Sequence, residues 1–340
     1  MDYTFTNFVV GSSNQFAHAA ALAVANLPAE AYNPLILYGG TGLGKTHLLH
    51  AVAHRIRQHH PTWRVVYLPA ESFRRELVQA LHHERMDAFQ ERYRQADVLL
   101  VDDLQFMAGR ERTQEAFLHI FNALYEAKKQ IVFSSDKPPQ DIAPLAARLR
   151  SRLTAGLMAD LQPPDLETRL AILDRKALAH GIVLPPSVAM LIASRVRTNV
   201  GELEQCLTRI ATYASLHTQS IDESLAEMIL QQAFAEREQA VTAPRIQQTV
   251  AAHFGLKMSE LRSKRRQRAV VFPRQVAMYL CRELTDASLP EIGRHFGGRD
   301  HTTVLHACAK IARMEETDES VARLLWQLRR KLAPGCGKVE

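Results

Sequence analysis

The segment 39–46, Gly-Gly-Thr-Gly-Leu-Gly-Lys-Thr, has the residue types and spacing of a loop that binds phosphate groups. Such a loop turns its backbone N–H groups inward, and a helix that starts at its end adds partial positive charge. In the pattern G-x-x-x-x-G-K-[ST], the lysine reaches the β- and γ-phosphates of a nucleotide and the final hydroxyl meets Mg²⁺. We predict these roles for Lys45 and Thr46. A Gly-rich turn without a ligand is the alternative, and the flanking strand and helix patterns argue against it.

Two carboxylates, Asp102 and Asp103, follow the apolar run at residues 98–101. An apolar run of this length favours a buried strand, and a P-loop ATPase holds its metal at the end of such a strand. Asp102 is predicted to coordinate Mg²⁺ directly or through water, and Asp103 to orient or deprotonate the attacking water. The short Asp, where many such ATPases have Glu, indicates modest turnover. An ordinary turn at the end of a strand is the alternative.

Short apolar runs and helical patterns alternate through the first half of the chain, which is typical of parallel βαβ units in a doubly wound sheet. The predicted strands are residues 35–38, 65–68, 98–101 and 131–133. After Pro163 and Pro164 helices are expected at residues 165–180, 186–196, 200–216 and 221–239. These patterns predict an ATPase core at 1–162, a helical lid with a connector helix at 163–239, and a helical domain at 240–340.

The stretch 288–307 predicts two short helices joined by a turn at Gly297 and Gly298, which is a helix-turn-helix. The expected apolar faces consist of Leu289, Ile292 and Phe296 in the first helix and Val304, Leu305, Ala307, Cys308 and Ile311 in the second. The second helix begins with polar side chains that suit base edges in a major groove: Arg299, Asp300, His301, Thr302 and Thr303. An ordinary helix pair, in which Asp300 or Thr302 only caps the helix, is the alternative.

Positive charge is concentrated in the C-terminal part of the chain. Residues 240–340 contain 18 of the 42 Lys and Arg residues but only 10 of the 36 Asp and Glu residues. Such asymmetry indicates a polyanionic partner for this part. Five of its cations lie in the seven residues from Arg262 to Arg268, so we expect this loop to contact phosphates with a strong dependence on salt.

The remaining composition excludes several other classes of protein. No apolar run is long enough to span a bilayer, and the first residues lack the features of a signal peptide, so a cytoplasmic location is expected. The four cysteines form no Cys-x-x-Cys pair, and the fifteen histidines show no metal-ligand spacing. A zinc site or a disulfide framework is therefore not indicated.

The segment 297–306, Gly-Gly-Arg-Asp-His-Thr-Thr-Val-Leu-His, resembles the signature of the DnaA family of bacterial chromosomal replication initiators. The resemblance extends over residues 2–333. It implies an AAA+ P-loop core with a helical lid, followed by a helix-turn-helix domain for double-stranded DNA, which is an α/β plus all-α chain. It also implies a site for ATP or ADP with Mg²⁺, formed by Phe8, Val9, Asn14, Gly40, Thr41, Gly42, Leu43, Gly44, Lys45, Thr46, His47 and Asp102. Phe8 and Val9 would pack around adenine, with plain core packing as the alternative.

The catalytic residues that the resemblance implies are Asp103, Asp136 and Arg152. Asp136 lies in a segment similar to sensor I of AAA+ proteins, nearest the γ-phosphate and the metal. Arg152 matches the arginine finger that reaches ATP bound by the neighbouring subunit, and Arg148 would lie at the same interface; a solvated helix face is the alternative.

One position departs from the family pattern. Where the family usually has an Arg that touches the nucleotide from the lid, this chain has Gly201. Arg195 or Arg197 could compensate from the preceding turn. ATP hydrolysis is therefore expected to be weak, and less certain than ATP binding.

The resemblance also assigns DNA contacts. Asp300, His301, Thr302 and Thr303 would meet bases, Arg299, Arg282 and Lys310 phosphates, Leu289 and Pro290 the backbone, and Arg266 the minor groove. Val78 and Arg112 would contact single-stranded DNA in the channel of a filament. Without the resemblance, Val78 has the pattern of a core residue and Arg112 that of a surface residue.

These features predict an initiator in which ATP joins subunits into a homo-oligomeric filament on origin DNA. The filament would melt an adjacent A·T-rich segment, and hydrolysis would dismantle it. An ATP-responsive transcription regulator without strand-opening activity is the alternative, although the sequence lacks the Gly-Ala-Phe-Thr-Gly-Ala motif that resembles activators of alternative sigma factors. A repressor that keeps ATP only structurally is a third option, favoured by Gly201. The predicted ATPase begins at the first residues, so the helicase-recruiting N-terminal domain of the family is expected to lie outside this sequence.

Overall fold

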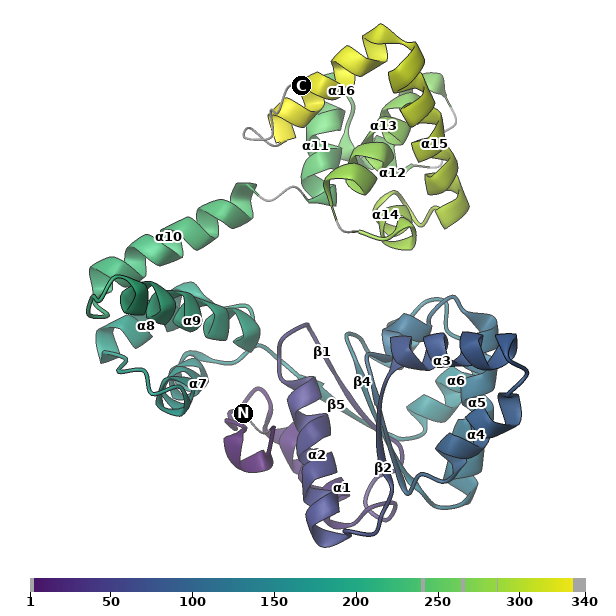
Figure 1. Ribbon diagram of the computed structural model, residues 1–340, viewed down its shortest axis with the longest axis vertical. Helices are drawn as coiled ribbons and strands as arrows, with labels where there is room; N and C mark the ends of the chain where they lie inside the picture. The colour runs from purple at the N-terminus through teal and green to yellow at the C-terminus, as the bar shows by residue number, and fades with distance from the viewer. Residues whose placement is uncertain (1–2, 240–241, 264–266, 286, 333–340) are drawn as a thin grey trace. The chain divides into compact units, whose positions relative to one another are not determined.

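The computed structural model of the chain describes residues 3–239, 242–263, 267–285 and 287–332. Contacts between residues divide the chain into two compact units, Met1–Leu230 and Gln231–Glu340. The first unit holds a parallel sheet with many helices, and the described part of the second is helical (Figure 1). Within the described residues, no helix is both long enough and apolar enough to cross a bilayer.

Five parallel strands form the sheet of the first unit in the order β2-β3-β4-β1-β5. The strands are β1 (Leu35–Gly39), β2 (Val65–Pro69), β3 (Val98–Asp102), β4 (Gln130–Ser135) and β5 (Leu157–Leu161). One face is covered by α1 (Gln15–Asn26) and α2 (Lys45–His59) (Figure 1). The other face is covered by α3 (Ala70–His82), α4 (Met86–Arg94), α5 (Glu111–Glu126) and α6 (Ala147–Thr154). Three short 3-10 helices, η1 (Phe5–Asn7), η2 (Leu104–Met107) and η3 (Pro139–Asp141), lie in the connections.

Side chains of the central strands alternate between the two helical layers, as the pleat of a strand requires. In β1, Ile36 packs into the core formed with α3–α6, whereas Leu35 and Leu37 pack into the core formed with α1 and α2. All three are fully buried. Because both faces are covered, these strands read as continuous apolar runs, and the four predicted strands are found close to their expected bounds.

The fifth strand, β5, is present in the structure but is not among the four strands that the sequence predicts. It pairs with β1 alone, from Leu157 opposite Leu35 to Leu161 opposite Gly39, and so lies at the edge of the sheet. Met158 and Asp160 are only partly buried there. An edge strand with a half-exposed Asp lacks the continuous apolar run by which the other strands are recognised.

Four helices follow the sheet: α7 (Leu166–Ala179), α8 (Pro186–Arg195), α9 (Val200–Leu216) and α10 (Glu223–Gln239). Their bounds agree with the prediction, and the N-termini of α7 and α9 are capped by a neighbouring side chain. The Asp165 side chain accepts a hydrogen bond from the Thr168 N–H, and the Asn199 side chain accepts one from the Glu202 N–H. The boundary between the two compact units falls within α10.

The second unit consists of α11 (Ala243–Phe254), α12 (Met258–Arg262), α13 (Arg268–Leu284), α14 (Leu289–His295), α15 (His301–Thr317) and α16 (Glu319–Leu332). Its core contains Val276, Leu280, Ile292, Phe296, Val304 and Leu328. The turn between α14 and α15 requires glycine: Gly297 has a φ of 80°, and a Cβ there would lie 2.1 Å from the Arg262 carbonyl oxygen. The predicted helix-turn-helix is therefore confirmed.

Two details of that prediction are wrong. The second helix is not short, since α15 has 17 residues. Leu305 does not belong to its apolar face, because its side chain is 52% exposed, whereas Val304, Ala307 and Ile311 are buried. The buried residues recur about every 3.6 positions and so form one stripe along α15 that packs against α13. Residue 305 lies beside that stripe.

Candidate functional site

The loop 39–46 connects β1 to α2, as the phosphate-binding pattern predicts. Gly44, the N-cap of α2, has a φ of 99°, and a Cβ there would lie 2.9 Å from the Phe8 ring. The Lys45 side chain is only 7% exposed, and its Nζ donates hydrogen bonds to the carbonyl oxygens of Gly39 at 2.8 Å and Gly40 at 2.7 Å. Burial lowers the pKa of Lys45, and the nearby carboxylates of Asp103, Asp102 and Asp136 oppose that shift. The lysine is thus a positive charge enclosed among carboxylates and backbone carbonyls.

Asp102 ends β3 in a network of hydroxyl donors from three other segments. The Thr46 hydroxyl donates to Asp102 Oδ2 at 2.9 Å, and the Tyr67 hydroxyl of β2 donates to the same oxygen at 2.7 Å. The Ser134 hydroxyl of β4 donates to Oδ1. Burial and this contact raise the pKa of Tyr67, which keeps the phenol protonated as a donor. The two residues predicted as metal ligands, Thr46 and Asp102, are therefore in direct contact.

Asp103 and Asp136 lie beside this network at the carboxyl edge of the sheet. Asp103 has a φ of 59°, an unusual conformation for a residue other than glycine, and its Oδ1 accepts from Gln105 Nε2 at 3.0 Å. Gln105 Oε1 in turn accepts from the Asp136 N–H at 3.2 Å. The buried Asp136 Oδ1 has no hydrogen-bond partner among the described residues. Since buried polar atoms are nearly always paired, this oxygen indicates a place for a cation or a donor.

The N-terminal segment is held against the P-loop helix by polar and aromatic contacts. Asn14 is buried, accepts from the Gly11 N–H at 2.9 Å and donates to the Val9 carbonyl at 3.0 Å. The ring of Phe8 lies edge-on to His47, with centroids 5.2 Å apart. His47 Nε2 lies 2.8 Å from the Thr4 carbonyl, a contact that a neutral imidazole makes as donor.

These parts surround a cavity of about 310 Å³. All of the predicted nucleotide-binding residues line it except Gly40 and Asp102, and the predicted catalytic residues Asp103 and Asp136 line it as well. Gly40 instead accepts a bond from Lys45, and Asp102 lies behind Thr46. Further lining residues were not predicted: Tyr3, Asn7, Gln105, Ile172, Arg175, Lys176, Val200 and Glu204. Most of these come from the lid, and no local motif marks them.

Gly201 lines the cavity, but neither of the cations proposed to replace a side chain there does, among the residues described. Arg195 pairs with Glu227 at 3.4 Å, with about half of each side chain exposed. Arg197 donates to the Ser194 carbonyl at 2.9 Å and is exposed. The proposed compensation by Arg195 or Arg197 is therefore wrong, because both lie on the outer side of the lid.

Arg148 and Arg152 are exposed on α6, and neither is among the described residues that line the cavity. The Arg152 guanidinium lies 6.0 Å from the centre of the Tyr125 ring. That ring stacks on buried Phe121, with centroids 5.8 Å apart and an angle of 11° between the planes. Arg152 is thus presented at the surface on a ring that is anchored in the core, as a contact with another molecule requires.

The polar start of α15 combines capping with exposure. Asp300 is the N-cap, and its Oδ1 accepts from the Thr302 N–H at 2.8 Å and from the Thr302 hydroxyl at 2.7 Å. These bonds lower the pKa of Asp300. His301, Thr302 and Thr303 are all exposed. Asp300 therefore caps α15, while His301, Thr302 and Thr303 lie at the surface of its first turn.

The predicted phosphate-contacting residues of the second unit differ in their settings. Arg282 and Lys310 are exposed, as is Pro290, while Leu289 is half-buried. Arg299 is half-buried and donates to the Ser263 carbonyl at 2.8 Å, so it also anchors the end of the basic loop. Arg266 lies outside the described residues. No sequence motif marks Gln275, whose buried Oε1 has no partner among the described residues. Gln275 lines a small cavity with Arg299 and Thr303.

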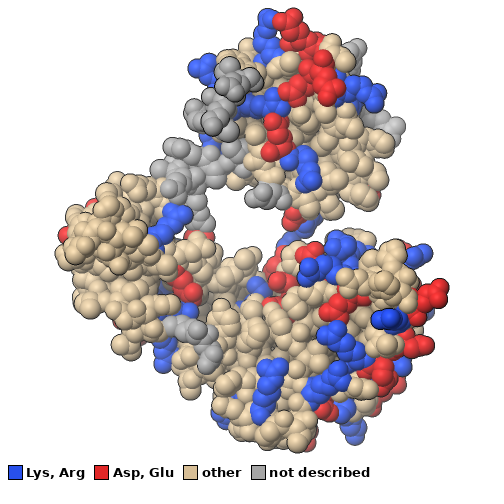
Figure 2. All heavy atoms as spheres, viewed as in Figure 1, with Lys and Arg blue, Asp and Glu red and all other residues tan. Residues whose placement is uncertain are grey.

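Val78 and Arg112 are both exposed on the first unit, so the pattern that marked Val78 as core is misleading: its side chain is 43% exposed. Arg112 lines a shallow surface pocket with Arg110 and Pro144. On the face seen in Figure 2, Lys and Arg atoms gather over the part that carries α3–α5, whereas the lobe with α8 and α9 shows few charged atoms. Asp and Glu atoms lie among them, so on this face the charged side chains of both signs are more numerous away from the lid.

Both units match models of one protein family. The bacterial DnaA ATPase domain matches residues 1–160, and the bacterial DnaA helix-turn-helix matches residues 243–311. The chain is 53% identical to the chromosomal replication initiator protein DnaA of Symbiobacterium thermophilum, over 96% of this chain and 71% of that protein. This chain belongs to the DnaA family. It is also 54% identical to the DnaA of Thermus thermophilus, over 96% of this chain and 75% of that protein.

A solved structure of a replication initiator DnaA bound to AMPPCP and single-stranded DNA is similar over nearly the whole length. It is 32% identical, with a TM-score of 0.60 over 97% of this chain and 98% of that chain. The predicted AAA+ core with a C-terminal helix-turn-helix is thereby confirmed for this member of the DnaA family.

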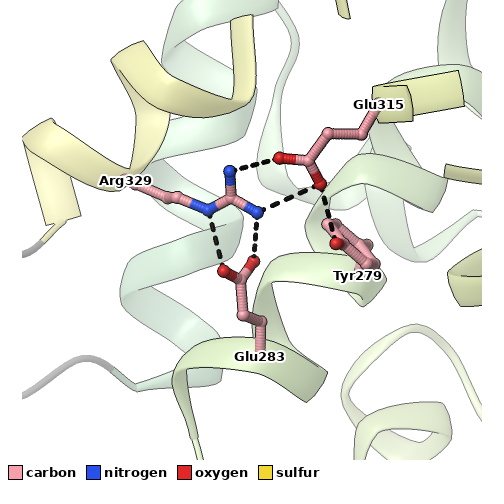
Figure 3. A network of polar contacts seen from close by, with 4 residues as sticks. All are labelled: Tyr279, Glu283, Glu315 and Arg329. Carbon is pink, nitrogen blue, oxygen red and sulfur yellow. Dashed lines mark hydrogen bonds and ion pairs between the residues drawn. The ribbon is translucent and has the colours of Figure 1, made fainter. Parts of the chain in front are cut away.

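A polar network ties the last helix of this DnaA-family chain to the helix-turn-helix (Figure 3). Arg329 of α16 lies between two carboxylates: it pairs with Glu283 of α13 at 2.8 Å and with Glu315 of α15 at 2.5 Å. The Tyr279 hydroxyl donates to Glu315 at 2.8 Å, and burial with this contact raises the pKa of Tyr279 to about 12. The bonds from Arg329 lower the pKa of Glu315. One guanidinium therefore connects the three helices.

We expect Arg329→Met to lower the free energy of unfolding of the second unit by about 1 to 3 kcal/mol, because it leaves Glu283 and Glu315 without their cation. Arg323→Met is the matched control, since its partner Glu319 and Arg323 itself are largely exposed and such pairs contribute little. A carboxylate with a lowered pKa stabilises the fold above its unfolded pKa and loses that contribution as the pH falls through its folded pKa. The difference between wild type and Arg329→Met should therefore shrink below about pH 4.

Hydrogen exchange of α13, α15 and α16 in the whole chain, followed against denaturant and pH, measures this difference. Equal protection in the Arg329 and Arg323 variants would contradict the role of the network.

Proposed function

We propose that this chain is an ATP-dependent initiator of DNA replication that binds origin DNA through its second unit and assembles through its first. The observation that carries the proposal is the match of both units, in order, to one family whose relatives are named chromosomal replication initiators. The P-loop cavity and the exposed start of α15 support it independently.

ATP or ADP would bind in the cavity at the end of β1. The backbone N–H groups of the loop 41–46 and the Lys45 ammonium would hold the phosphates, and Phe8 with Val9 would line the adenine side. The related DnaA structure bound to AMPPCP supports a nucleotide at this place. The cavity volume of about 310 Å³ lies in the range of small-molecule sites.

The carboxyl edge fits a magnesium ion. Mg²⁺ uses one or two carboxylates together with phosphate oxygens and water, and here Thr46 and Asp102 are in contact while Asp136 Oδ1 lacks a partner. The ion would supply Lewis-acid polarisation of the phosphates. Thr46 and Asp102 would hold it, and Tyr67 and Ser134 would orient the Asp102 carboxylate.

Hydrolysis would depend on Asp103, Asp136 and an arginine from outside. Asp103 would orient the attacking water and accept its proton, while Gln105 holds the Asp103 carboxylate. Arg152 would neutralise charge on ATP bound by a second copy of this chain. We expect slow turnover that serves to dismantle the assembly.

The second unit would read duplex DNA with the start of α15 in the major groove. His301, Thr302 and Thr303 would meet bases, with Asp300 fixing the helix start, and Arg282, Arg299, Lys310 and Arg266 would contact phosphates. Leu289 and Pro290 would meet the DNA backbone through α14. Val78 and Arg112 would contact single-stranded DNA, which the related structure also contains. The assembly would work in the cytoplasm, where the chromosome lies.

Permanganate footprinting on supercoiled DNA that carries the target boxes tests the proposal. We expect unpaired thymines in the A·T-rich segment with ATP, and none with ADP or with the Arg152→Ala variant. Protection of the boxes without any unpaired thymine at saturating protein would instead favour the ATP-responsive transcription regulator.

If Thr302 contacts bases in the major groove, Thr302→Ala should affect specific and random duplex DNA differently. The change should weaken binding to the specific duplex by about 1 to 3 kcal/mol and binding to random duplex very little. Thr317→Ala, at the other end of α15, is the matched control because that hydroxyl bonds the Arg313 carbonyl within the helix. Fluorescence anisotropy on both duplexes at fixed salt measures the difference. If Thr302→Ala weakens both duplexes equally, the residue contacts phosphate and not bases.

A further inference from the structure

The lid places a largely buried cation at the wall of the nucleotide cavity. Lys176 of α7 lines the cavity, and its side chain is only 16% exposed. Its Nζ lies 2.8 Å from Glu204 Oε1 of α9, which lines the cavity too and is 41% exposed. The neighbouring Arg175 also lines the cavity, but its Nη1 donates to the Phe8 carbonyl at 3.5 Å and so contacts the N-terminal segment.

The start of α9 brings this pair close to the P-loop. The N–H groups of Val200 and Gly201 lie 3.0 Å and 3.3 Å from the Gly42 carbonyl oxygen, and both point to it as donors. Glu204 follows Gly201 by one helical turn and shares its face of α9. Gly201 contributes no side chain to the cavity wall, and a Cβ there would lie 3.4 Å from Asn199 Oδ1 and 3.9 Å from Gly42 Cα.

We propose that Lys176 binds the phosphate chain of the nucleotide from the lid, and that the Glu204 carboxylate competes with the phosphates for its ammonium. The proposal rests on nucleotide binding at the P-loop. A flexible ammonium with three donors can keep one bond to Glu204 and direct others at phosphate oxygens. The lid thereby supplies a positive charge from Lys176 of α7, in addition to that of Lys45 in the P-loop. Position 201 of α9, where the family usually has Arg, supplies none because it is Gly.

The two partners of this ion pair then have opposite effects on ATP affinity. Lys176 attracts the phosphates, whereas the Glu204 carboxylate repels them and competes for the ammonium. An ion pair that only stabilises the lid would behave differently, because loss of either partner would disturb the same structure in the same direction.

Three variants of the whole chain separate these cases: Lys176→Met, Glu204→Gln and the double variant. In titrations at fixed salt, we expect Lys176→Met to weaken ATP and ADP binding about 10-fold or more, since charge-assisted bonds are involved. Glu204→Gln should strengthen binding about threefold. Lys176→Met leaves the Glu204 carboxylate unpaired, whereas the double variant does not, so the double variant is the control for folding. It should still bind ATP less tightly than Glu204→Gln alone.

The lid pair Arg195 and Glu227 gives the matched controls, because it lies outside the described lining of the cavity. Arg195→Met and Glu227→Gln should leave ATP affinity unchanged. Adenosine, measured by competition against a fluorescent ATP analogue, should lose none of its affinity in Lys176→Met.

Weakening of ATP binding by Glu204→Gln to the same extent as by Lys176→Met would overturn the proposal and make the pair structural. Unchanged ATP affinity in Lys176→Met, or an equal loss for adenosine, would overturn it as well. Failure of the wild-type chain to bind ATP would instead refute the proposed function itself, so the two failures are distinguishable.

Discussion

We expect the replacement of Lys45 by alanine to abolish measurable binding of ATP and ADP and to leave binding to specific duplex DNA intact. Lys45 is 7% exposed and is the P-loop cation nearest to Asp102, Asp103 and Asp136. Without its charge, three carboxylates and the phosphates would face one another in a largely enclosed site. Removing one partner of a buried charge cluster costs about 3 to 5 kcal/mol, which would correspond to roughly 10²- to 10⁴-fold in affinity.

Isothermal titration with ATP measures the first part of this prediction, and anisotropy of a labelled duplex without nucleotide measures the second. Lys137→Ala is the matched control, because Lys137 follows the same edge of the sheet but is exposed and outside the described lining of the cavity. Undiminished ATP affinity in Lys45→Ala would refute the assignment of the phosphates to this loop. Loss of duplex binding as well would show that the variant is misfolded or that the two units depend on each other.

The second large effect is expected for Arg152→Ala, which should bind ATP normally and fail to assemble. Its guanidinium is exposed, rests on Tyr125 and does not line the cavity of its own chain. Its guanidinium is therefore available to a nucleotide bound by a second copy of the chain, and an arginine finger in trans contributes about 10³- to 10⁵-fold to turnover. Light scattering with ATP and duplex DNA should show large particles for wild type and none for the variant.

Mixing two inactive variants tests the same idea more sharply. Lys45→Ala keeps its Arg152 but has no nucleotide, and Arg152→Ala keeps its nucleotide but has no finger. A mixture should therefore recover part of the ATP hydrolysis that each variant lacks, because one interface in the mixed assembly is complete. Arg197→Ala, another exposed arginine outside the cavity lining, should behave as wild type. No recovery in the mixture, with ATP-dependent particles from Arg152→Ala alone, would refute the finger role.

Most of the architecture could be predicted from the residues alone because its signals are local. The central strands are covered on both faces and read as unbroken apolar runs, and the lid helices begin at caps such as Asp165 and Asn199. The P-loop motif places Lys45 and Thr46 at the start of α2 by its spacing. Asp102, Asp103 and Asp136 follow parallel strands, whose carboxyl ends meet at one edge, so their proximity could be expected as well.

The errors have the same origin, in contacts that no short segment encodes. The edge strand β5 needs only one partner and therefore carries a weak pattern, and Leu305 and Val78 are apolar residues whose exposure depends on where the neighbouring helices pack. Arg195 and Arg197 were proposed for the cavity because they are near Gly201 in sequence. Arg195 pairs instead with Glu227, and Arg197, in the connection between α8 and α9, donates to the Ser194 carbonyl, whereas Lys176 lines the cavity from α7.

Local sequence thus specified the P-loop, the strand-end carboxylates and the helix-turn-helix, since each depends on residues a few positions apart. Long-range packing alone selected which lid cation lines the cavity, left the buried Asp136 Oδ1 without a partner among the described residues, and joined Arg329 to Glu283 and Glu315. The physical reason is that a motif defines backbone conformation over a few residues. The direction in which a distant side chain points follows only from how whole helices pack against one another.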